Sequence, residues 1–241
     1  MIILMQLIKT DVGYIVFNDG LPENPSKNWF NIEYWRENKA IVGSSQGRYT
    51  TWFIHHLGEN WVLRHYYRGG LIEKISRDRY LFCGLKRTRA MAEFNLLNIL
   101  YREKFAVPKP IAANIIRQGL YYRADLIIER INDAEDLLAR LDRASMTQEE
   151  WFALGLCIAQ FHQRGVYHAD LNAKNILLDK NKFYLIDFDR GEIKKPHSSW
   201  KQANLKRLLR SFNKEKAKSS KLAFTLNNWQ QLQQGYQSIK Q

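Results

Sequence analysis

The side chains best suited to chemistry lie in one stretch, HADLNAKNILLDKNKFYLIDFDRG, which spans residues 168–191. The apolar runs ILL and FYLI flank DKNK (179–182), a composition typical of a tight turn between two strands. Antiparallel partners have a constant sum of residue numbers, so Asn175 and Asp187 should lie side by side at the open end of this hairpin. Asp170 lies in the loop that leads into the same end. The spacing therefore predicts two carboxylates and one carboxamide close together.

Oxygen ligands clustered in this way suit Mg²⁺, which takes few protein ligands and keeps several waters. Asn175 and Asp187 are the predicted metal ligands. Asp170 can then orient a hydroxyl nucleophile, and Lys174 beside it is the second predicted catalytic residue. The pattern H-x-D-x-x-x-x-N followed by I-D-F matches the phosphoryl-transfer residues of protein-kinase-like enzymes. The alternative interpretation is an acidic loop on an ordinary hairpin.

A second candidate group lies upstream, on a predicted strand and the helix that follows it. Alternation in WVLRHY places Val62, Arg64 and Tyr66 on one strand face. In the helix predicted from Thr88, Glu93 lies at the margin of an apolar stripe. A buried carboxylate needs a cation because an unpaired buried charge is costly. Arg64 is the candidate, where kinases pair a strand lysine with a helix glutamate; the alternative is a surface glutamate on a helix edge.

Two glycines could contact phosphates. Gly43 and Gly47, in GSSQG, precede a predicted strand and could let backbone N–H groups approach an anion. A plain hairpin turn explains them equally well.

The elements that must position these residues change in character along the chain. Residues 1–40 are predicted to be irregular, with an aromatic cluster. The predicted strands are 40–54, 60–67, 119–123 and 126–131, and the predicted helices are 88–104, 135–143 and 147–164. Thr147 and Glu150 form a T-x-x-E capping box, and Gly165 ends that helix. We therefore predict an α+β, protein-kinase-like fold in two lobes: a β-rich, nucleotide-binding lobe over 1–131 and a mainly helical, catalytic and acceptor-binding lobe over 132–241.

Composition narrows the function classes. The 241 residues include 37 Lys and Arg against 24 Asp and Glu, a net charge of +13, which favours anionic partners such as nucleic acid, phosphorylated lipids or an acidic substrate. The cysteines, Cys83 and Cys157, are predicted to be buried thiols in a reducing compartment. No apolar run approaches the ~20 residues of a membrane-spanning helix, and the N-terminus does not resemble a signal peptide, so we expect a cytoplasmic location.

Taken together, these segments resemble the lipopolysaccharide kinase family of the protein-kinase-like fold. The motifs that carry the resemblance are GRYTTWF (47–53), VLRHYYRGG (62–70), RAMAEFNLL with Glu93, PKPIAA (108–113), LIIERI, HADLNAKN (168–175), LIDFDRG (185–191) and NLKRLLRSF (204–212). The resemblance implies transfer of the γ-phosphate of ATP, with Mg²⁺, to the 4-hydroxyl of 3-deoxy-D-manno-octulosonic acid (Kdo) on a lipid A precursor. It implies a monomeric, peripheral protein on the cytoplasmic face of a bacterial inner membrane.

The same resemblance implies roles for individual residues. Asp170 matches the catalytic aspartate, Asn175 and Asp187 match the metal ligands, and Glu93 matches the helix glutamate. The segment from Glu129 to Ile131 would form the hinge that receives adenine.

Three departures from the kinase pattern matter. Arg64 stands where protein kinases have lysine, and Ala169 replaces the arginine of H-R-D. The chain has D-F-D-R-G in place of D-F-G, so Asp189 is a rival or second metal ligand. Little chain remains after Gly191 for an activation loop or a peptide-docking region, which favours a small, lipid-linked acceptor.

The basic C-terminal segment has two interpretations. An apolar stripe runs beside basic residues, so this helix could lie against an anionic leaflet or could pack in the core with a solvated basic face. The stripe is Leu205, Leu208, Leu209 and Phe212, and the basic residues are Lys201, Lys206, Arg207 and Arg210. A second basic cluster, with the same ambiguity, comprises Arg77, Arg79, Lys86, Arg87 and Arg89. Among the histidines, His168 is expected to brace the catalytic loop, and zinc is not expected.

Other functions remain open at this point. A kinase of another core sugar, such as the inner-core heptose, would use the same motifs. A non-catalytic nucleic-acid binder fits the charge but lacks a recognisable groove-reading or stacking motif. A pseudokinase is disfavoured because Asp170, Asn175 and Asp187 are all present.

Overall fold

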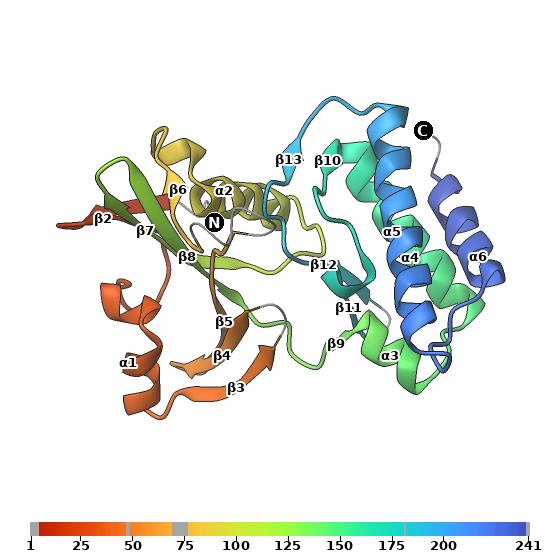
Figure 1. The fold of residues 1–241 in the computed structure, drawn as a ribbon, viewed down its shortest axis with the longest axis horizontal. Helices are drawn as coiled ribbons and strands as arrows, with labels where there is room; N and C mark the ends of the chain where they lie inside the picture. The colour runs from red at the N-terminus through yellow and green to blue at the C-terminus, as the bar shows by residue number, and fades with distance from the viewer. Residues whose placement is uncertain (1–4, 47–48, 69–76, 181, 240–241) are drawn as a thin grey trace. The chain divides into compact units, whose positions relative to one another are not determined.

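The computed structural model describes residues 5–46, 49–68, 77–180 and 182–239, and it divides into two compact units. The first unit contains residues 1–99 and 108–131, and the second contains residues 100–107 and 132–241 (Figure 1). The predicted boundary assigned 100–107 to the first lobe. These residues group with the second unit because the Leu185 N–H donates to the Ala106 carbonyl at 3.0 Å and Arg164 pairs with Glu103 at 2.6 Å.

The first unit is built on an eight-stranded antiparallel sheet in the order β1-β2-β7-β8-β5-β4-β3, with β6 paired to β8. Its strands are β1 (Met5–Lys9), β2 (Gly13–Asn18), β3 (Ile41–Gln46), β4 (Thr50–His56), β5 (Glu59–His65), β6 (Tyr80–Leu81), β7 (Pro110–Gln118) and β8 (Tyr121–Glu129). Its helices are α1 (Ile32–Glu37) and α2 (Arg89–Arg102), of which α2 continues into the second unit.

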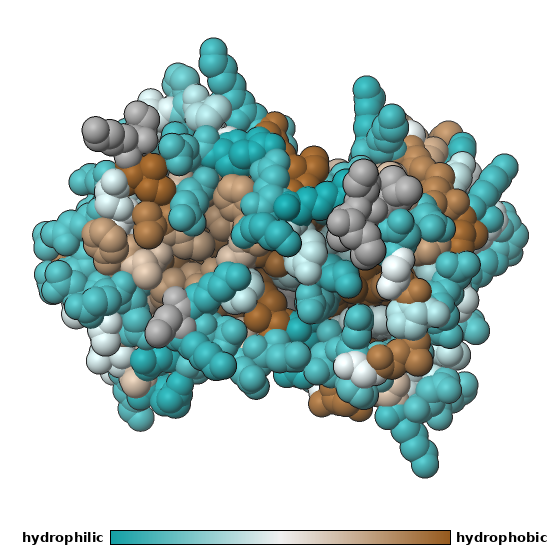
Figure 2. All heavy atoms as spheres, turned by 180° about the vertical axis from the view of Figure 1, so that it is seen from behind, coloured by the Kyte–Doolittle hydropathy of each residue, from teal (hydrophilic) through white to brown (hydrophobic). Residues whose placement is uncertain are grey.

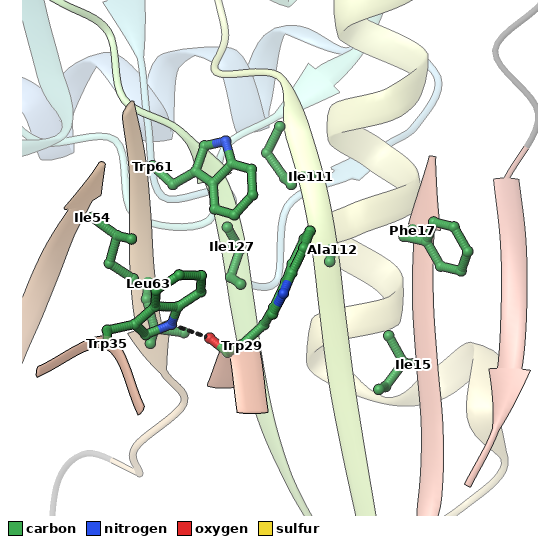
Figure 3. Packing of buried hydrophobic residues seen from close by; sticks show 10 residues of the cluster. All are labelled: Ile15, Phe17, Trp29, Trp35, Ile54, Trp61, Leu63, Ile111, Ala112 and Ile127. Carbon is green, nitrogen blue, oxygen red and sulfur yellow. Dashed lines mark hydrogen bonds between the residues drawn. The ribbon is translucent and has the colours of Figure 1, made fainter. Parts of the chain in front are cut away.

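A cluster of indole rings forms the centre of this unit. The rings of Trp29 and Trp61 lie 4.8 Å apart between centroids, and the Trp35 indole N–H donates to the Trp29 carbonyl at 2.6 Å (Figure 3). Trp61 and Leu63 project from β5 into this cluster. Because side chains alternate along a strand, Arg64 projects from the opposite face of β5.

Three predictions for the first unit were wrong. Residues 1–40 are not irregular but contribute β1, β2 and α1, since β2 gains its partner, β7, from far along the chain. The run 40–54 is two strands, β3 and β4. The runs 119–123 and 126–131 belong to a single strand, β8, which pairs continuously with β7 from Tyr121 to Ile127.

The second unit is mainly helical. It contains α3 (Leu137–Arg143), α4 (Gln148–Arg164), α5 (Ser198–Lys218) and α6 (Leu226–Gln237), with short strands β9 (Glu135–Asp136), β10 (Val166–Tyr167), β11 (Ile176–Asp179), β12 (Lys182–Leu185) and β13 (Glu192–Ile193). The capping box of Thr147 and Glu150 is confirmed at the start of α4, and Gly165 ends that helix in the left-handed conformation with φ 87°. The mixed α and β content, rich in sheet first and helical afterwards, confirms the predicted α+β class.

Helices α4 and α6 approach each other closely at two glycines. A Cβ atom on Gly155 would lie 1.9 Å from the Leu232 carbonyl oxygen, and one on Gly235 would lie 1.9 Å from the Phe152 carbonyl oxygen. Only glycine permits this backbone contact.

The apolar stripe of α5 is occupied within the fold. Leu208 and Phe212 are fully buried, and the Phe212 ring stacks on Phe224 with 4.6 Å between centroids. The core-packed interpretation of this helix is therefore correct for those two residues. Lys206, with several other α5 basic residues, is exposed. The face opposite to the view of Figure 1 carries hydrophilic residues around hydrophobic patches (Figure 2). Within the described residues, no helix is both long and apolar enough to cross a membrane.

Candidate active site

The loop after β10, residues 168–175, presents Asp170 to solvent, with 59% of its side chain exposed. Its backbone is held from three directions. The Asp170 N–H donates to Nδ1 of His168 at 3.2 Å, while the Asp170 carbonyl accepts from Nδ2 of Asn175 at 2.9 Å and from Nδ2 of Asn172 at 3.0 Å. These bonds fix the loop around the carboxylate that the sequence predicts to be catalytic.

The two predicted metal ligands lie at the open end of the β11–β12 hairpin. The register pairs Ile176 with Leu185, and the N–H of Ile186 donates to the Asn175 carbonyl at 3.0 Å. Asp187 is the next residue and has a left-handed backbone with φ 61°. Phe188, which follows, is fully buried.

Phe188 anchors the D-F-D segment. Its ring contacts Phe161 at 6.0 Å and His168 at 4.8 Å between centroids. Asp187 and Asp189, on either side of it, are half-buried. The buried ring therefore holds the segment in place while both neighbouring acids stay partly accessible to solvent.

His168 joins residues 168–175, the predicted catalytic loop, to this acidic segment, which confirms its predicted bracing role. Burial lowers the pKa of His168, against the hydrogen bond to the Ile186 carbonyl and the charges of Asp187 and Asp170, which raise it. The imidazole is therefore neutral near pH 7. Its Nε2–H donates to the Ile186 carbonyl at 2.9 Å, and its Nδ1 accepts from the Asp170 N–H. One ring therefore links the backbone of Asp170 to the backbone of Ile186, the residue before Asp187.

A relay of hydrogen bonds behind His168 reaches the last helix. The Tyr236 hydroxyl donates to Nδ1 of His162 at 2.8 Å, and Nε2–H of His162 donates to Oδ1 of Asn204 at 3.3 Å. Nδ2 of Asn204 then donates to the His168 carbonyl at 3.1 Å. Burial lowers the pKa of His162 to about 4, so this ring is also neutral and can donate and accept at once.

Sequence reasoning missed His162, Asn204 and Tyr236. The signal that could have found them is a polar residue at a core position: Asn204 precedes the buried Leu208 by one helical turn, yet it is itself 2% exposed.

Lys174 is placed differently from the other predicted residues. Its ammonium lies 3.8 Å from Oε1 of Glu215 on α5, and its side chain is largely exposed. The contacts in the described part of the chain link Asp170 to Arg207 instead, through a 3.1 Å bond to Asp170 Oδ1. A catalytic role for Lys174 stays a prediction.

The first unit carries the predicted pair of Arg64 and Glu93. Nη2 of Arg64 donates to Oε1 of Glu93, and the Tyr66 hydroxyl donates to Oε2 at 2.6 Å. Glu93 is only 2% exposed, and a buried carboxylate needs such partners. Each of its two oxygens accepts a hydrogen bond, one from Arg64 and one from Tyr66. The predicted pairing is confirmed; its role toward a nucleotide stays a prediction.

The other residues predicted to contact the nucleotide are Gly43, Gly47, Glu129 and Ile131. Gly43 lies at a bulge of β3, where the pairing with β4 shifts register, and Gly47 lies outside the described residues. Glu129 is the last residue of β8, and its N–H donates to the Lys109 carbonyl at 2.8 Å. Ile131, half-buried, is the last residue of the first unit.

The donor set fits a hard divalent cation. The Nδ2 atom of Asn175 is engaged by the Asp170 carbonyl, so Oδ1 is the atom that the carboxamide can offer to a metal. With Asp187, and Asp189 nearby in sequence, this gives a small set of oxygen donors, as Mg²⁺ accepts. Within the described residues, no group of three or more His, Cys, Asp or Glu side chains forms a metal site on its own.

The prediction of a buried thiol is wrong for Cys83, whereas Cys157 is partly buried. Cys83 is exposed, because it lies in a loop after β6 and not in the core. Cys157 lines an open groove of about 670 Å³ between residues 103–106, α4 and β12, and burial raises the pKa of its thiol to about 12. None of the predicted site residues lines this groove.

A comparison with protein families gives the decisive observation. The model of the lipopolysaccharide kinase (Kdo/WaaP) family matches residues 32–236. The chain belongs to this family. The match includes both the Arg64–Glu93 pair and the loop that carries Asp170.

Curated relatives in this family cover almost the whole chain. The chain is 45% identical to the "3-deoxy-D-manno-octulosonic acid kinase" of Mannheimia succiniciproducens, over 97% of this chain and all of that protein. It is 43% identical to the protein of the same name from Photobacterium damsela subsp. piscicida, over 95% of both chains. Among solved structures, "WaaP in complex with acyl carrier protein" is similar with a TM-score of 0.57 and 14% identity, over 98% of this chain and 90% of that chain. That likeness supports the fold.

Proposed function

We propose that this chain is an ATP-dependent kinase of lipopolysaccharide inner-core biosynthesis that phosphorylates the 4-hydroxyl of Kdo in a Kdo–lipid A precursor. The observation that carries this proposal is the identity of 40–45% to proteins named for Kdo kinase activity. The heptose alternative is not favoured, because the relatives compared share the Kdo kinase name. Family membership likewise argues against a nucleic-acid binder as the explanation of the basic charge.

The second unit would supply the acid–base and metal-binding groups. Asp170 would orient the acceptor hydroxyl and accept its proton late, as the new O–P bond forms and the bond to the ADP leaving group breaks. Asn175 and Asp187, with Asp189 as a possible third donor, would hold Mg²⁺. When bound, Mg²⁺–ATP supplies the phosphoryl group and neutralises its charge. Lys174 would add positive charge beside the loop.

The first unit would supply nucleotide contacts. Arg64, held in place by Glu93, would contact phosphate oxygens in the role that protein kinases give to lysine. The backbone around Gly43 and Gly47 would cover the phosphates, and the segment from Glu129 to Ile131 would receive adenine. Positioning and electrostatics supply most of the acceleration in such reactions.

We also propose that the protein acts as a monomer at the cytoplasmic face of the bacterial inner membrane. The acceptor is an anionic glycolipid, and exposed basic residues of α5 would favour an anionic surface by about 1 kcal/mol for each residue near it. A flotation assay with anionic and neutral vesicles tests this part, and equal binding to both would contradict it.

The function is tested by mass spectrometry of a Kdo–lipid A precursor incubated with the protein and Mg²⁺–ATP. We expect a product heavier by one phosphate, located on the Kdo 4-hydroxyl. Asp170→Asn should lower the rate by about 10²–10⁴-fold. The matched control Asp142→Asn, on α3, should keep the wild-type rate.

Two results would overturn the proposal. A wild-type protein that leaves the Kdo acceptor unmodified but phosphorylates a heptose acceptor is a kinase of another core sugar. An Asp170→Asn protein as fast as the wild type would remove Asp170 from the chemistry.

A further inference from the structure

Helix α5 contacts the catalytic loop through one polar stripe. Asn204 donates to the His168 carbonyl at 3.1 Å, and Ser211 accepts from the Ala173 N–H at 2.9 Å through its hydroxyl. Between them, Arg207 donates from Nη1 to Oδ1 of Asp170 at 3.1 Å. The spacing i, i+3 and i+7 places the three residues on one face of the helix. Because Asn204 and Ser211 attach the helix to the loop on both sides of Arg207, the backbone of Arg207 is held beside the loop that carries Asp170.

Stability does not account for the ion pair of Arg207 and Asp170. The two side chains are 46% and 59% exposed, and ion pairs with such exposure contribute little to folding. Asn204 and Ser211 already attach the helix to the loop. What the pair does change is the local charge, since a guanidinium lies against the carboxylate that would meet the acceptor.

The proposed acceptor makes this placement informative. Kdo is an octulosonic acid, so the sugar that presents its hydroxyl to Asp170 also carries a carboxylate. Two carboxylates brought together repel each other, and a cation between them removes that cost. Arginine has five N–H donors in a planar fork that matches a carboxylate, so one donor can remain on Asp170 while others engage a second anion.

We propose that Arg207 binds the carboxylate of the acceptor sugar and thereby makes the enzyme specific for an acidic acceptor. This inference rests on the proposed function and assigns a substrate contact to α5. Lys206, the preceding residue, is exposed on a different face of the helix and makes none of the loop contacts that place Arg207, so it serves as a matched control.

The test combines variants with a modified acceptor. The Kdo–lipid A precursor and its analogue with the sugar carboxylate converted to a carboxamide are compared by kcat/KM. We expect the wild type to prefer the acid by about 10-fold, because a hydrogen bond to a charged group is roughly twice as strong as one to a neutral group. Arg207→Gln should lose this preference through a raised KM for the acid, with little change for the carboxamide. Arg207→Lys should recover part of it. Lys206→Gln should keep the wild-type ratio of the two kcat/KM values, because a weaker attachment to an anionic surface lowers both values alike.

Two outcomes overturn the inference. If Arg207→Gln lowers kcat/KM equally for both acceptors, Arg207 only positions Asp170. If the wild type has the same kcat/KM for the acid and for the carboxamide, the enzyme does not recognise the carboxylate. Because Asn204 and Ser211 keep α5 in place, Arg207→Gln should retain the wild-type thermal unfolding transition.

A binding measurement separates this inference from the proposed function. Calorimetric titration with the methyl glycoside of Kdo, and with its carboxamide, requires no turnover. If the wild type transfers no phosphate to Kdo but binds the acid more tightly in an Arg207-dependent way, the proposed function fails and the inference stands. If phosphate is transferred but binding shows no dependence on Arg207, the inference fails and the function stands.

Discussion

Asn204 is the residue whose replacement should most directly disconnect the catalytic loop from the helical part of the second unit. Its side chain makes two buried hydrogen bonds, accepting from Nε2–H of His162 and donating to the carbonyl of His168. The change Asn204→Leu keeps the approximate volume and removes both bonds. It leaves a buried donor and a buried acceptor without the partner they now have.

The magnitude follows from the two groups. Each buried polar group that loses its partner costs about 1–3 kcal/mol, which gives about 2–6 kcal/mol for the pair. Leucine is a better helix former than asparagine and returns up to about 0.7 kcal/mol. We therefore expect the free energy of unfolding to fall by about 1–5 kcal/mol, with a lower kcat because the His168 carbonyl loses its hydrogen bond to Asn204.

Urea unfolding at neutral pH measures the change, with Asn213→Leu as the control. Asn213 is exposed on the same helix, so that variant receives the gain in helix propensity without breaking the relay. It should stay within about 0.5 kcal/mol of the wild type or gain slightly. If Asn204→Leu is as stable as Asn213→Leu, the relay contributes nothing to the fold and the reasoning is refuted.

Three further predictions concern other parts of the chain. Gly155→Ala should destabilise by about 1–3 kcal/mol in urea unfolding despite its better helix propensity, because the new methyl group meets backbone; a neutral result would contradict the close helix contact. Arg64→Met should cost about 3–5 kcal/mol by leaving buried Glu93 uncompensated at that oxygen, and adding Glu93→Gln should recover part of it in a double-mutant cycle. Burial lowers the pKa of His65, but the hydrogen bond to Asp125 and the charges of Asp125 and Asp78 raise it by more, so the folded pKa lies above the ordinary 6.5. The stability that this pair contributes should therefore be present below about pH 6.5 and be lost as pH rises through the folded pKa. Asp125→Asn should flatten this dependence when unfolding is measured at a series of pH values.

The placement of the candidate site residues in the second unit could be predicted largely from sequence because these residues are close together in the chain, while their roles stay predictions. The residues from Asp170 to Asp187 belong to one loop and one hairpin, and a tight turn fixes the register of such a hairpin. The prediction for Arg64 and Glu93 needed two elements, yet strand alternation and helix periodicity were enough to identify the pair. In both cases, short-range periodicity determined which side chains share a face.

The parts that could not be predicted depend on long-range partners. Strand β2 is buried because β7, about a hundred residues later, pairs with it, and nothing within residues 1–40 indicates this. The basic residues of α5 were ambiguous for the same reason. The sequence does not distinguish a surface cation that faces solvent from one that faces a membrane or a carboxylate. Only the fold places Arg207 beside Asp170.

The catalytic loop explains why α5 needs polar residues on a face next to its core stripe. The loop has only a two-residue strand before it and a single turn of 3-10 helix within it, so few of its backbone groups are paired by regular structure. Buried backbone groups must be bonded somewhere. Asn204 donates a hydrogen bond to the His168 carbonyl, and Ser211 accepts one from the Ala173 N–H. The sequence of α5 therefore satisfies two requirements at once: apolar residues that complete the core, and short polar side chains that replace the missing backbone partners of the loop.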